Sequence, residues 1–135
     1  MNPKIDFINP EALLKNPAFS QVAVTKGSGN TIYIGGQNAI TKELEIIGKG
    51  DIKFQTEFIL NNIEVALAAC GATLNDLVKL TIYIVQGQDV KKGFEGAQAF
   101  LRRLSRPPVI TGIIVAGLAH PDYLVEIEAV AFQNI

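Results

Sequence analysis

The sequence contains one cysteine, Cys70, and one histidine, His120, among its 135 residues. A single cysteine excludes an internal disulfide and any metal site built from several cysteines, and a single histidine leaves no second imidazole for a metal pair. We therefore expect no metal and no cofactor. Cys70 ends a helical pattern between Ala69 and Gly71, and we expect it to be a small packed residue.

Charged residues are also scarce, at 19% of the chain against a usual share of about 25%. Lysine and arginine number 12 and aspartate and glutamate 13, so the net charge is −1. Nucleic-acid binders usually carry a basic stripe, whereas Lys91-Lys92 and Arg102-Arg103-Arg106 are typical of solvated helix faces. We expect no nucleic-acid partner, and the low charge indicates that another subunit covers part of the surface.

Long hydrophobic runs are missing as well. No apolar run reaches the roughly 18 residues that a membrane helix needs, and the N-terminus lacks a positive region followed by an apolar core. We expect a cytoplasmic protein without a membrane partner. The length fits one domain, which we place over residues 1–135. Residues 1–18 hold three of the six prolines and are expected to form an irregular lead-in.

Alternating and turn-bounded segments predict strands over residues 21–26, 31–37, 44–48 and 77–85. Two helices are predicted between and after them, with Asp51 and Asp89 as their N-caps and Gly71 just past the end of the first. An apolar stripe at helical spacing marks the second helix. Its members are Val90, Phe94, Ala97, Leu101 and Leu104.

The segment from Arg106 to Phe132 holds two β-prone apolar runs around the polar turn A-H-P-D, which predicts a hairpin. The element order is then β-β-β-α-β-α-β-β. This order indicates an α+β domain in which two helices cover one face of a mixed sheet. The other face needs cover, and we expect self-association to provide it.

Two glutamates interrupt the last apolar strand. Because side chains alternate across a strand, Glu126 and Glu128 point to one face and Ile127 to the other. Carboxylates are rarely buried without a partner. Such a group could work as an acid or base beside an apolar cleft, or serve as a structural acceptor, and the residues leave both interpretations open. His120 is interpreted as part of the turn chemistry.

Two glycine-rich segments, Gly27-Ser28-Gly29 and Gly35-Gly36, match neither a P-loop nor a dinucleotide-binding fingerprint. The first is interpreted as a turn and the second as a bulge. Gly36 has a further possible use, since a glycine lets a ligand approach the backbone closely.

Three separated motifs resemble the YjgF/RidA (Rid) family, and the resemblance extends from about Phe19 to Phe132. They are Y-I-G-G-Q-N at 33–38, A-L-A-A-C-G-A-T-L-N-D-L-V-K at 66–79 and V-E-I-E-A-V-A at 125–131. The resemblance implies a chorismate-mutase-like α+β fold and a homotrimer with small-molecule clefts at the subunit interfaces. The best-known members hydrolyse reactive enamines and imines to a 2-oxo acid and ammonia. Other members have been described as ribonucleases or translation inhibitors.

The resemblance also implies site residues. In the deaminases of the family, an arginine at the start of the penultimate strand binds the substrate carboxylate, and a glutamate on the last strand positions or activates water. Glu126 falls at the glutamate position and is the expected catalytic residue. Ile110 falls at the arginine position, and Gly112 falls where many members carry cysteine. The other expected ligand-binding residues are Phe19, Gly36, Gln37 and Phe94.

An arginine-less site changes the expected ligand. A bidentate arginine pair makes two charge-assisted hydrogen bonds, so its loss should weaken binding of a carboxylate at least about tenfold. Arg106 lies four residues before Ile110, too far along a strand to replace the missing group. We therefore expect a less acidic or more apolar ligand.

Three functions stay open: an imine or enamine hydrolase that uses Glu126, a non-catalytic metabolite-binding or regulatory trimer, and, more remotely, an endoribonuclease. The sequence does not name the substrate or pathway, and it leaves open a functional role for His120 or Glu128.

Overall fold

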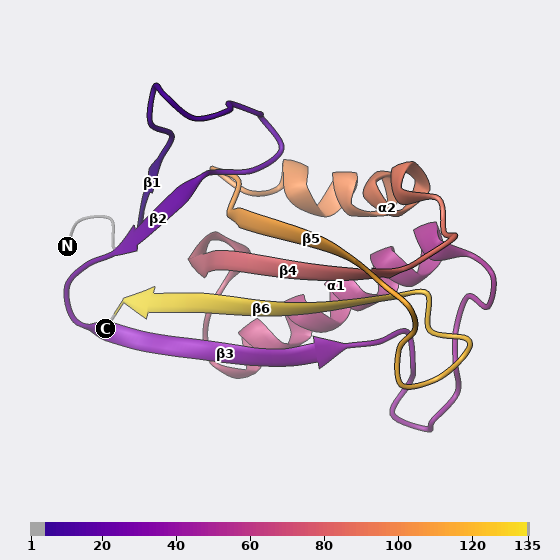
Figure 1. Ribbon diagram of the computed structural model, residues 1–135. Coiled ribbons are helices and arrows are strands. Elements are labelled where there is room, and N and C mark those ends of the chain that lie inside the picture. Colours follow the sequence, from indigo (N-terminus) through magenta and orange to yellow (C-terminus); the bar gives the residue numbers. More distant parts are fainter. Residues whose placement is uncertain (1–4, 135) are drawn as a thin grey trace.

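The computed structural model describes residues 5–134, and its main body is a four-stranded sheet with two helices on one face (Figure 1). The strands are β1 (Ile5–Ile8), β2 (Val22–Thr25), β3 (Gly29–Gln37), β4 (Leu77–Val85), β5 (Val109–Val115) and β6 (Val125–Asn134). The helices are α1 (Ile52–Ala69) and α2 (Val90–Arg102), with a short 3-10 turn over Leu74–Asp76. Neither α1 nor α2 is long and apolar enough to cross a membrane.

The sheet has the strand order β3-β6-β4-β5. Strand β6 runs antiparallel to both β3 and β4, whereas β4 and β5 are parallel. The predicted α+β class with a mixed sheet is thus confirmed, but the predicted C-terminal hairpin is wrong. The connection over residues 116–124 is much longer than a two-residue hairpin turn, and it carries the chain past β4, which separates β5 from β6.

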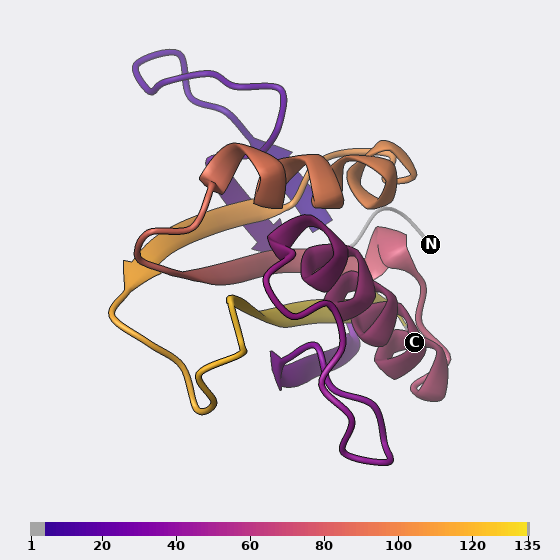
Figure 2. The same cartoon turned by 90° about the vertical axis from the view of Figure 1, so that its right-hand side faces the viewer.

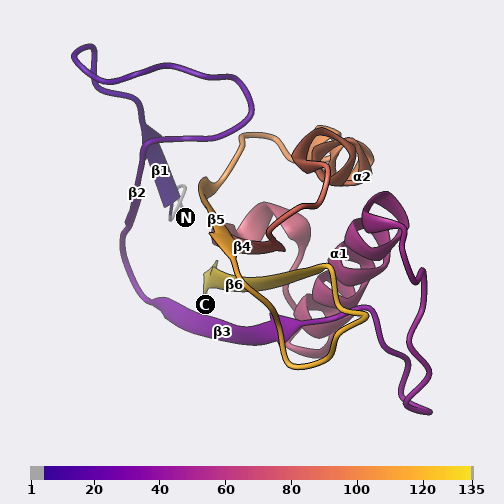
Figure 3. The same ribbon diagram turned by 45° about the vertical axis from the view of Figure 1, so that its right-hand side comes forward.

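Strands β1 and β2 form a separate two-stranded ribbon on the side of the sheet away from the helices (Figure 3). The prediction of an irregular lead-in over residues 1–18 is wrong for Ile5–Ile8, which pair antiparallel with Val22–Thr25. Pro10 and Pro17 lie in the connection between the two strands, where no ladder N–H group is required. The prolines therefore mark a connection and do not exclude a strand before it.

The predicted strand over residues 44–48 does not form. Ile40 and Ile46 make only an isolated antiparallel bridge. Leu44 between them has a φ of 70°, in the left-handed region that few non-glycine residues adopt, and its N–H donates to Thr41 O at 2.9 Å. The segment is therefore a tight turn, although three of the four residues in L-E-I-I are apolar.

Both predicted N-caps are confirmed. The Asp51 carboxylate accepts from the Phe54 N–H at 3.0 Å, and the Asp89 carboxylate accepts from the Lys92 N–H at 3.2 Å. Gly71 has a φ of 71°, as expected just after the end of α1. The expected packing of Cys70 is wrong, because this last turn reaches the surface and leaves the cysteine exposed.

The core lies between α1 and the strands β3, β6 and β4, and Figure 2 shows the helices and the sheet from the right-hand side of Figure 1. Ile127 is 0% exposed within it, whereas Glu126 and Glu128 are half-buried on the opposite face. The predicted alternation along β6 is confirmed. The fully buried apolar residues of α1 at the centre of the core are Ile59, Ile63 and Leu67.

Helix α2 packs on α1 through its small residues. Gly93 and Gly96 are buried, and a Cβ atom at position 96 would collide with the Lys53 carbonyl oxygen of α1. These two glycines weaken the helix by about 1 kcal/mol each against alanine, and the close approach of the two helices gives the reason for their presence.

Candidate functional site

A cavity of about 780 Å³ separates α2 from strands β4 and β5. Leu60, Leu80 and Ile127 form its buried apolar wall. The opposite wall is the predicted apolar stripe, which consists of Val90, Phe94, Ala97 and Leu101 of α2 and of Leu104 just after the helix. Val90 and Phe94 remain 50% and 43% exposed, so the stripe borders an open hollow instead of a closed core. Its volume lies within the range of small-molecule sites.

The segment before β2 reaches this cavity because Ser20 fixes it to the start of β5. The buried Ser20 hydroxyl donates to Pro107 O at 2.6 Å, and its N–H donates to Pro108 O at 2.9 Å. Phe19, the preceding residue, lines the cavity. Two short hydrogen bonds thus place an aromatic side chain at a site that lies about 90 residues away along the sequence.

Strand β5 contributes Ile110 and Gly112. They pair in parallel register with Leu80 and Ile82 of β4, and all four line the cavity. A Cβ atom at position 112 would meet no heavy atom within 4 Å, so this glycine leaves the cavity wall open. Four of the expected ligand-binding residues therefore meet at one cavity: Phe19, Phe94, Ile110 and Gly112.

Glu126 lies on the other face of the sheet, away from this cavity. Its Oε1 accepts from the Asn38 side-chain amide at 3.2 Å. Its carboxylate also occupies the space above Gly36, where any Cβ atom would collide with it. The β-bulge between Ile34 and Gln37, expected from the paired glycines, brings these residues to the carboxylate. Gly36 thus makes room for Glu126.

The side chain of Gln37 turns back on its own strand, where its amide donates to Gly35 O at 3.2 Å. It therefore accompanies Gly36 and Glu126 in sequence without contributing to the cavity. Asn38 was missed as a site residue, although it is the last letter of the Y-I-G-G-Q-N motif.

Tyr83 stands directly opposite Glu126 on the neighbouring strand, and Thr81 stands opposite Glu128. Side chains of such antiparallel pairs share a face. Partial desolvation, followed by the negative charge of Glu128 and a hydrogen bond to it, raises the pKa of the Tyr83 phenol. The open face thus carries two carboxylates on β6 and a phenol on the neighbouring strand β4.

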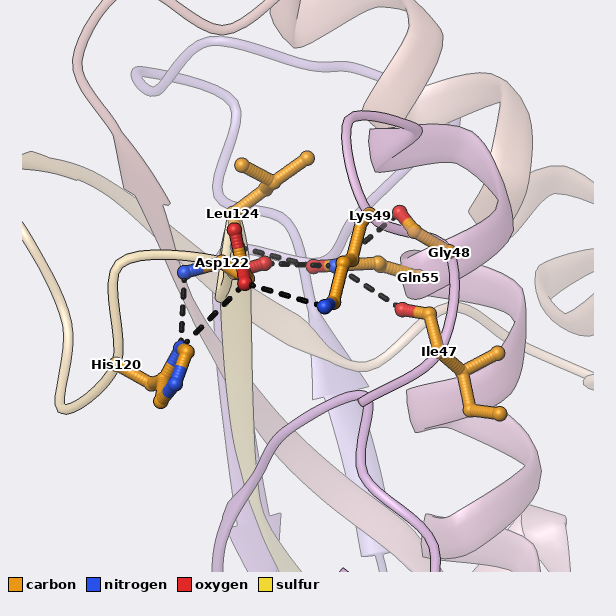
Figure 4. A network of polar contacts seen from close by, with 7 residues as sticks. All are labelled: Ile47, Gly48, Lys49, Gln55, His120, Asp122 and Leu124. Atoms are coloured by element: carbon orange, nitrogen blue, oxygen red, sulfur yellow. Dashed lines mark hydrogen bonds and ion pairs between the residues drawn. The ribbon is translucent and has the colours of Figure 1, made fainter. Parts of the chain in front are cut away.

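Buried Gln55 holds the loops that lead into β6 (Figure 4). Its amide donates to the carbonyl oxygens of Ile47, Gly48 and Asp122 at 3.1, 3.2 and 2.9 Å, and its oxygen accepts from the Leu124 N–H at 2.9 Å. Its two N–H groups are thus shared among three carbonyl oxygens, and its oxygen accepts one of the two hydrogen bonds that it can take. Since Leu124 precedes Glu126 by two residues, Gln55 fixes where β6 begins.

His120 belongs to the surface of the same loop. Its Nδ1 accepts from the Asp122 backbone N–H at 3.1 Å, which requires that nitrogen to lack a proton. The 3.9 Å separation from the Asp122 carboxylate is then no ion pair. This geometry is turn chemistry, as the sequence indicated.

Comparison with known proteins identifies the family to which the chain belongs. The family described as endoribonuclease L-PSP matches residues 10–133. A RutC family protein from Pyrococcus abyssi is 37% identical over 106 residues, which cover 78% of this chain and 81% of the relative. The chain belongs to the YjgF/RidA (Rid) family.

Solved Rid structures share the fold. A conserved Rid protein of unknown function from Yersinia pestis superimposes with a TM-score of 0.85 and 34% identity, covering 96% of this chain and 98% of that one. The YjgF gene product of E. coli gives a TM-score of 0.70 and 27% identity, covering 81% and 85%. The Rid fold expected from the three motifs is therefore confirmed.

Proposed function

We propose that this Rid protein works as a homotrimer, in which the cavity face of one copy and the Glu126 face of the next form a shared small-molecule cleft. Within one chain, the two groups of expected site residues lie on opposite faces of a sheet and cannot contact one ligand. Contact between copies would bring them together. Edge strand β5 supports such contact, because Ile113 and Ile114 are 38% and 56% exposed on it.

The proposed reaction is hydrolysis of a reactive imine or enamine. An enamine first tautomerises to the imine. Glu126 then accepts a proton from water as the water oxygen adds to the carbon of the C=N bond, and it returns this proton to the nitrogen. The hydroxyl proton of the resulting amino alcohol passes to the nitrogen as the C–N bond breaks, which releases ammonia and leaves a carbonyl compound. The observation that carries this proposal is the fixed carboxylate of Glu126, held by Asn38 above Gly36. A carboxylate held in one place by a side-chain donor can keep its second oxygen for water.

The substrate should differ from the compact 2-imino acids of the best-known deaminases. Ile110 presents an aliphatic side chain to the cavity and offers no hydrogen-bond donor to a carboxylate beside the reacting carbon. The cavity walls are mainly apolar. We propose a substrate with an apolar body whose reacting carbon carries no carboxylate.

Ammonia release from a panel of freshly generated imines tests the reaction. The wild-type protein should accelerate release, and Glu126→Gln should lower the rate by about 100-fold or more, the size typical for loss of a general base. Glu128→Gln is the matched control, because it removes a carboxylate two residues away on the same face. Equal rates with and without the wild-type protein would refute the proposal.

A second candidate is a non-catalytic metabolite-binding trimer, which the apolar lining of the cavity and Ile110 favour. A compound that raises the melting temperature and is recovered unchanged would support it. The name of the matched family suggests an endoribonuclease, but a net charge of −1 gives little attraction for a polyanion. Cleavage of RNA that survives Glu126→Gln and closure of the cavity would point to a contaminant.

A further inference from the structure

Three arginines, Arg102, Arg103 and Arg106, lie at or just after the end of α2, and they have different surroundings. Arg103 makes a bidentate pair with Glu64 of α1, at 2.9 and 2.5 Å. Arg106 donates to Phe7 O, and its guanidinium lies 5.2 Å from the centre of the Phe7 ring. Two of the three cations are therefore already engaged in holding the fold together.

Arg102 is the exception. It is exposed in the last turn of α2, and its side chain makes no hydrogen bond or ion pair with any residue between 5 and 134. It also lines the large cavity, and no other charged side chain does so among these residues. An unengaged guanidinium at the border of an apolar hollow is a strong donor without an acceptor.

Gln98 lies one helical turn before Arg102 and lines the same cavity. Residues four apart on a helix are neighbours on one face, so the amide of Gln98 and the guanidinium of Arg102 point in similar directions. Together they offer amide and guanidinium N–H donors at one border of the cavity. Beyond them the walls are Leu60, Leu80 and Ile127.

We propose that the cavity binds an amphipathic monocarboxylate, with its apolar body between α2 and the sheet and its carboxylate on Arg102 and Gln98. Planar guanidinium groups match carboxylates in geometry, and the apolar body removes hydrophobic surface from water. The cation would thus come from helix α2 and not from strand β5, where Ile110 stands. A single copy of the chain supplies all of these contacts, so the proposal does not depend on the trimer or on hydrolysis.

A purely structural role for Arg102 has a different signature. A cation in the last turn of a helix stabilises the helix dipole by about 0.3–1 kcal/mol. Its removal would then lower stability without changing the preference between a charged and a neutral ligand. The comparison of two ligands that share an apolar body separates the two roles.

Calorimetric titration with octanoate and octanamide tests the proposal, because these probes differ only in the head group. The wild-type protein should bind octanoate about three- to tenfold more tightly, a modest factor because the guanidinium is exposed to solvent. Arg102→Gln should remove this preference, because octanoate loses more affinity than octanamide when the positive charge is removed. Lys91→Gln is the control, because it removes one positive charge from the same helix away from the cavity.

A second variant checks the location. Position 112 has free space around a Cβ atom, so Gly112→Leu should fold and narrow the cavity, weakening binding of both probes. Equal affinity for the two probes in the wild-type protein, an equal effect of Lys91→Gln, or no binding of either probe would each overturn the proposal. The titration measures binding and not ammonia release, so its outcome does not depend on whether the protein hydrolyses imines.

Discussion

Glu126 owes its position to a residue that has no side chain. Its carboxylate occupies the volume that a Cβ atom at Gly36 would take, and Asn38 holds one of its oxygens. The neighbouring Gly35 differs, because a Cβ atom there would meet nothing within 4 Å. The two adjacent glycines of the bulge therefore form a matched pair for experiment.

Gly36→Ala should displace the Glu126 carboxylate and break its hydrogen bond with Asn38. The collision involves the end of a flexible side chain, so the loss of stability should stay below about 1 kcal/mol. Amide NMR would show a shifted Asn38 side-chain signal, and the proposed ammonia release should fall. Gly35→Ala should leave both unchanged. An unshifted Asn38 signal in Gly36→Ala would contradict the geometry.

Tyr83 gives a prediction on pH. Its pKa lies above the ordinary value of 10.0 because of partial desolvation and the carboxylate of Glu128. A raised folded-state pKa stabilises the fold below the unfolded value and loses this contribution as pH rises through the folded value, so the loss falls above about pH 10. Absorbance of the phenolate, compared with Tyr83→Phe, gives the midpoint. Glu128→Gln should lower it, whereas Glu95→Gln on α2 should not.

The sequence predicts the direction of side chains along a strand, because these directions follow from strand alternation. It does not predict which polar side chains bind partners that are distant in the sequence. The opposite directions of Glu126 and Ile127 needed only the period of a strand. Asn38 and Gln55 bind groups 88 and 69 residues away, respectively. No local pattern reveals such pairs, because the polar partner is set by the tertiary fold.

At the scale of elements, the contact between α1 and α2 rests on two glycines that local helix propensity disfavours. Replacing a helical glycine by alanine ordinarily stabilises a helix by up to about 1 kcal/mol. Gly96→Ala should do the opposite and destabilise the protein by about 1–3 kcal/mol, because the new methyl group meets the Lys53 backbone oxygen. Urea unfolding measures the difference.

Gly93→Ala, at the other buried glycine of α2, is the comparison for Gly96→Ala. A Cβ atom there would lie 3.2 Å from the terminal methyl of Ile52, which can rotate away. The cost should therefore be smaller than at Gly96, or the helix gain should balance it. Equal destabilisation by the two substitutions would show that the backbone contact does not decide the spacing of the helices.

The helices and strands were easier to predict from the sequence than the pairing of the strands in the sheet. N-caps and helical periodicity located both helices, since these signals are local. The C-terminal strands were found and then paired wrongly, because their apolar runs do not say which neighbour each strand takes. The apolar stripe of α2 was also predicted. Such a stripe usually packs against a core, whereas this one lines a cavity.

At the scale of the whole molecule, one face of the sheet carries both helices and the other is largely open, apart from the β1–β2 ribbon (Figure 3). Tyr33 is 80% exposed on this open side. If copies associate through this face and the β5 edge, Ile113→Lys should convert the proposed trimer to monomers in light scattering at micromolar concentration. Val65→Lys on the outer side of α1 should leave the mass unchanged. A monomeric wild-type protein would refute the assembly.

The position of β6 has a consequence for how the chain acquires its structure during synthesis. This strand lies between β3 and β4, yet it follows them by dozens of residues. A nascent chain that ends before Val125 holds β3 apart from β4, with the inner edges of both strands and the apolar face of α1 exposed to water. Folding of the sheet must therefore wait until β6 has left the ribosome, and until then these edges are open to aggregation or to chaperones.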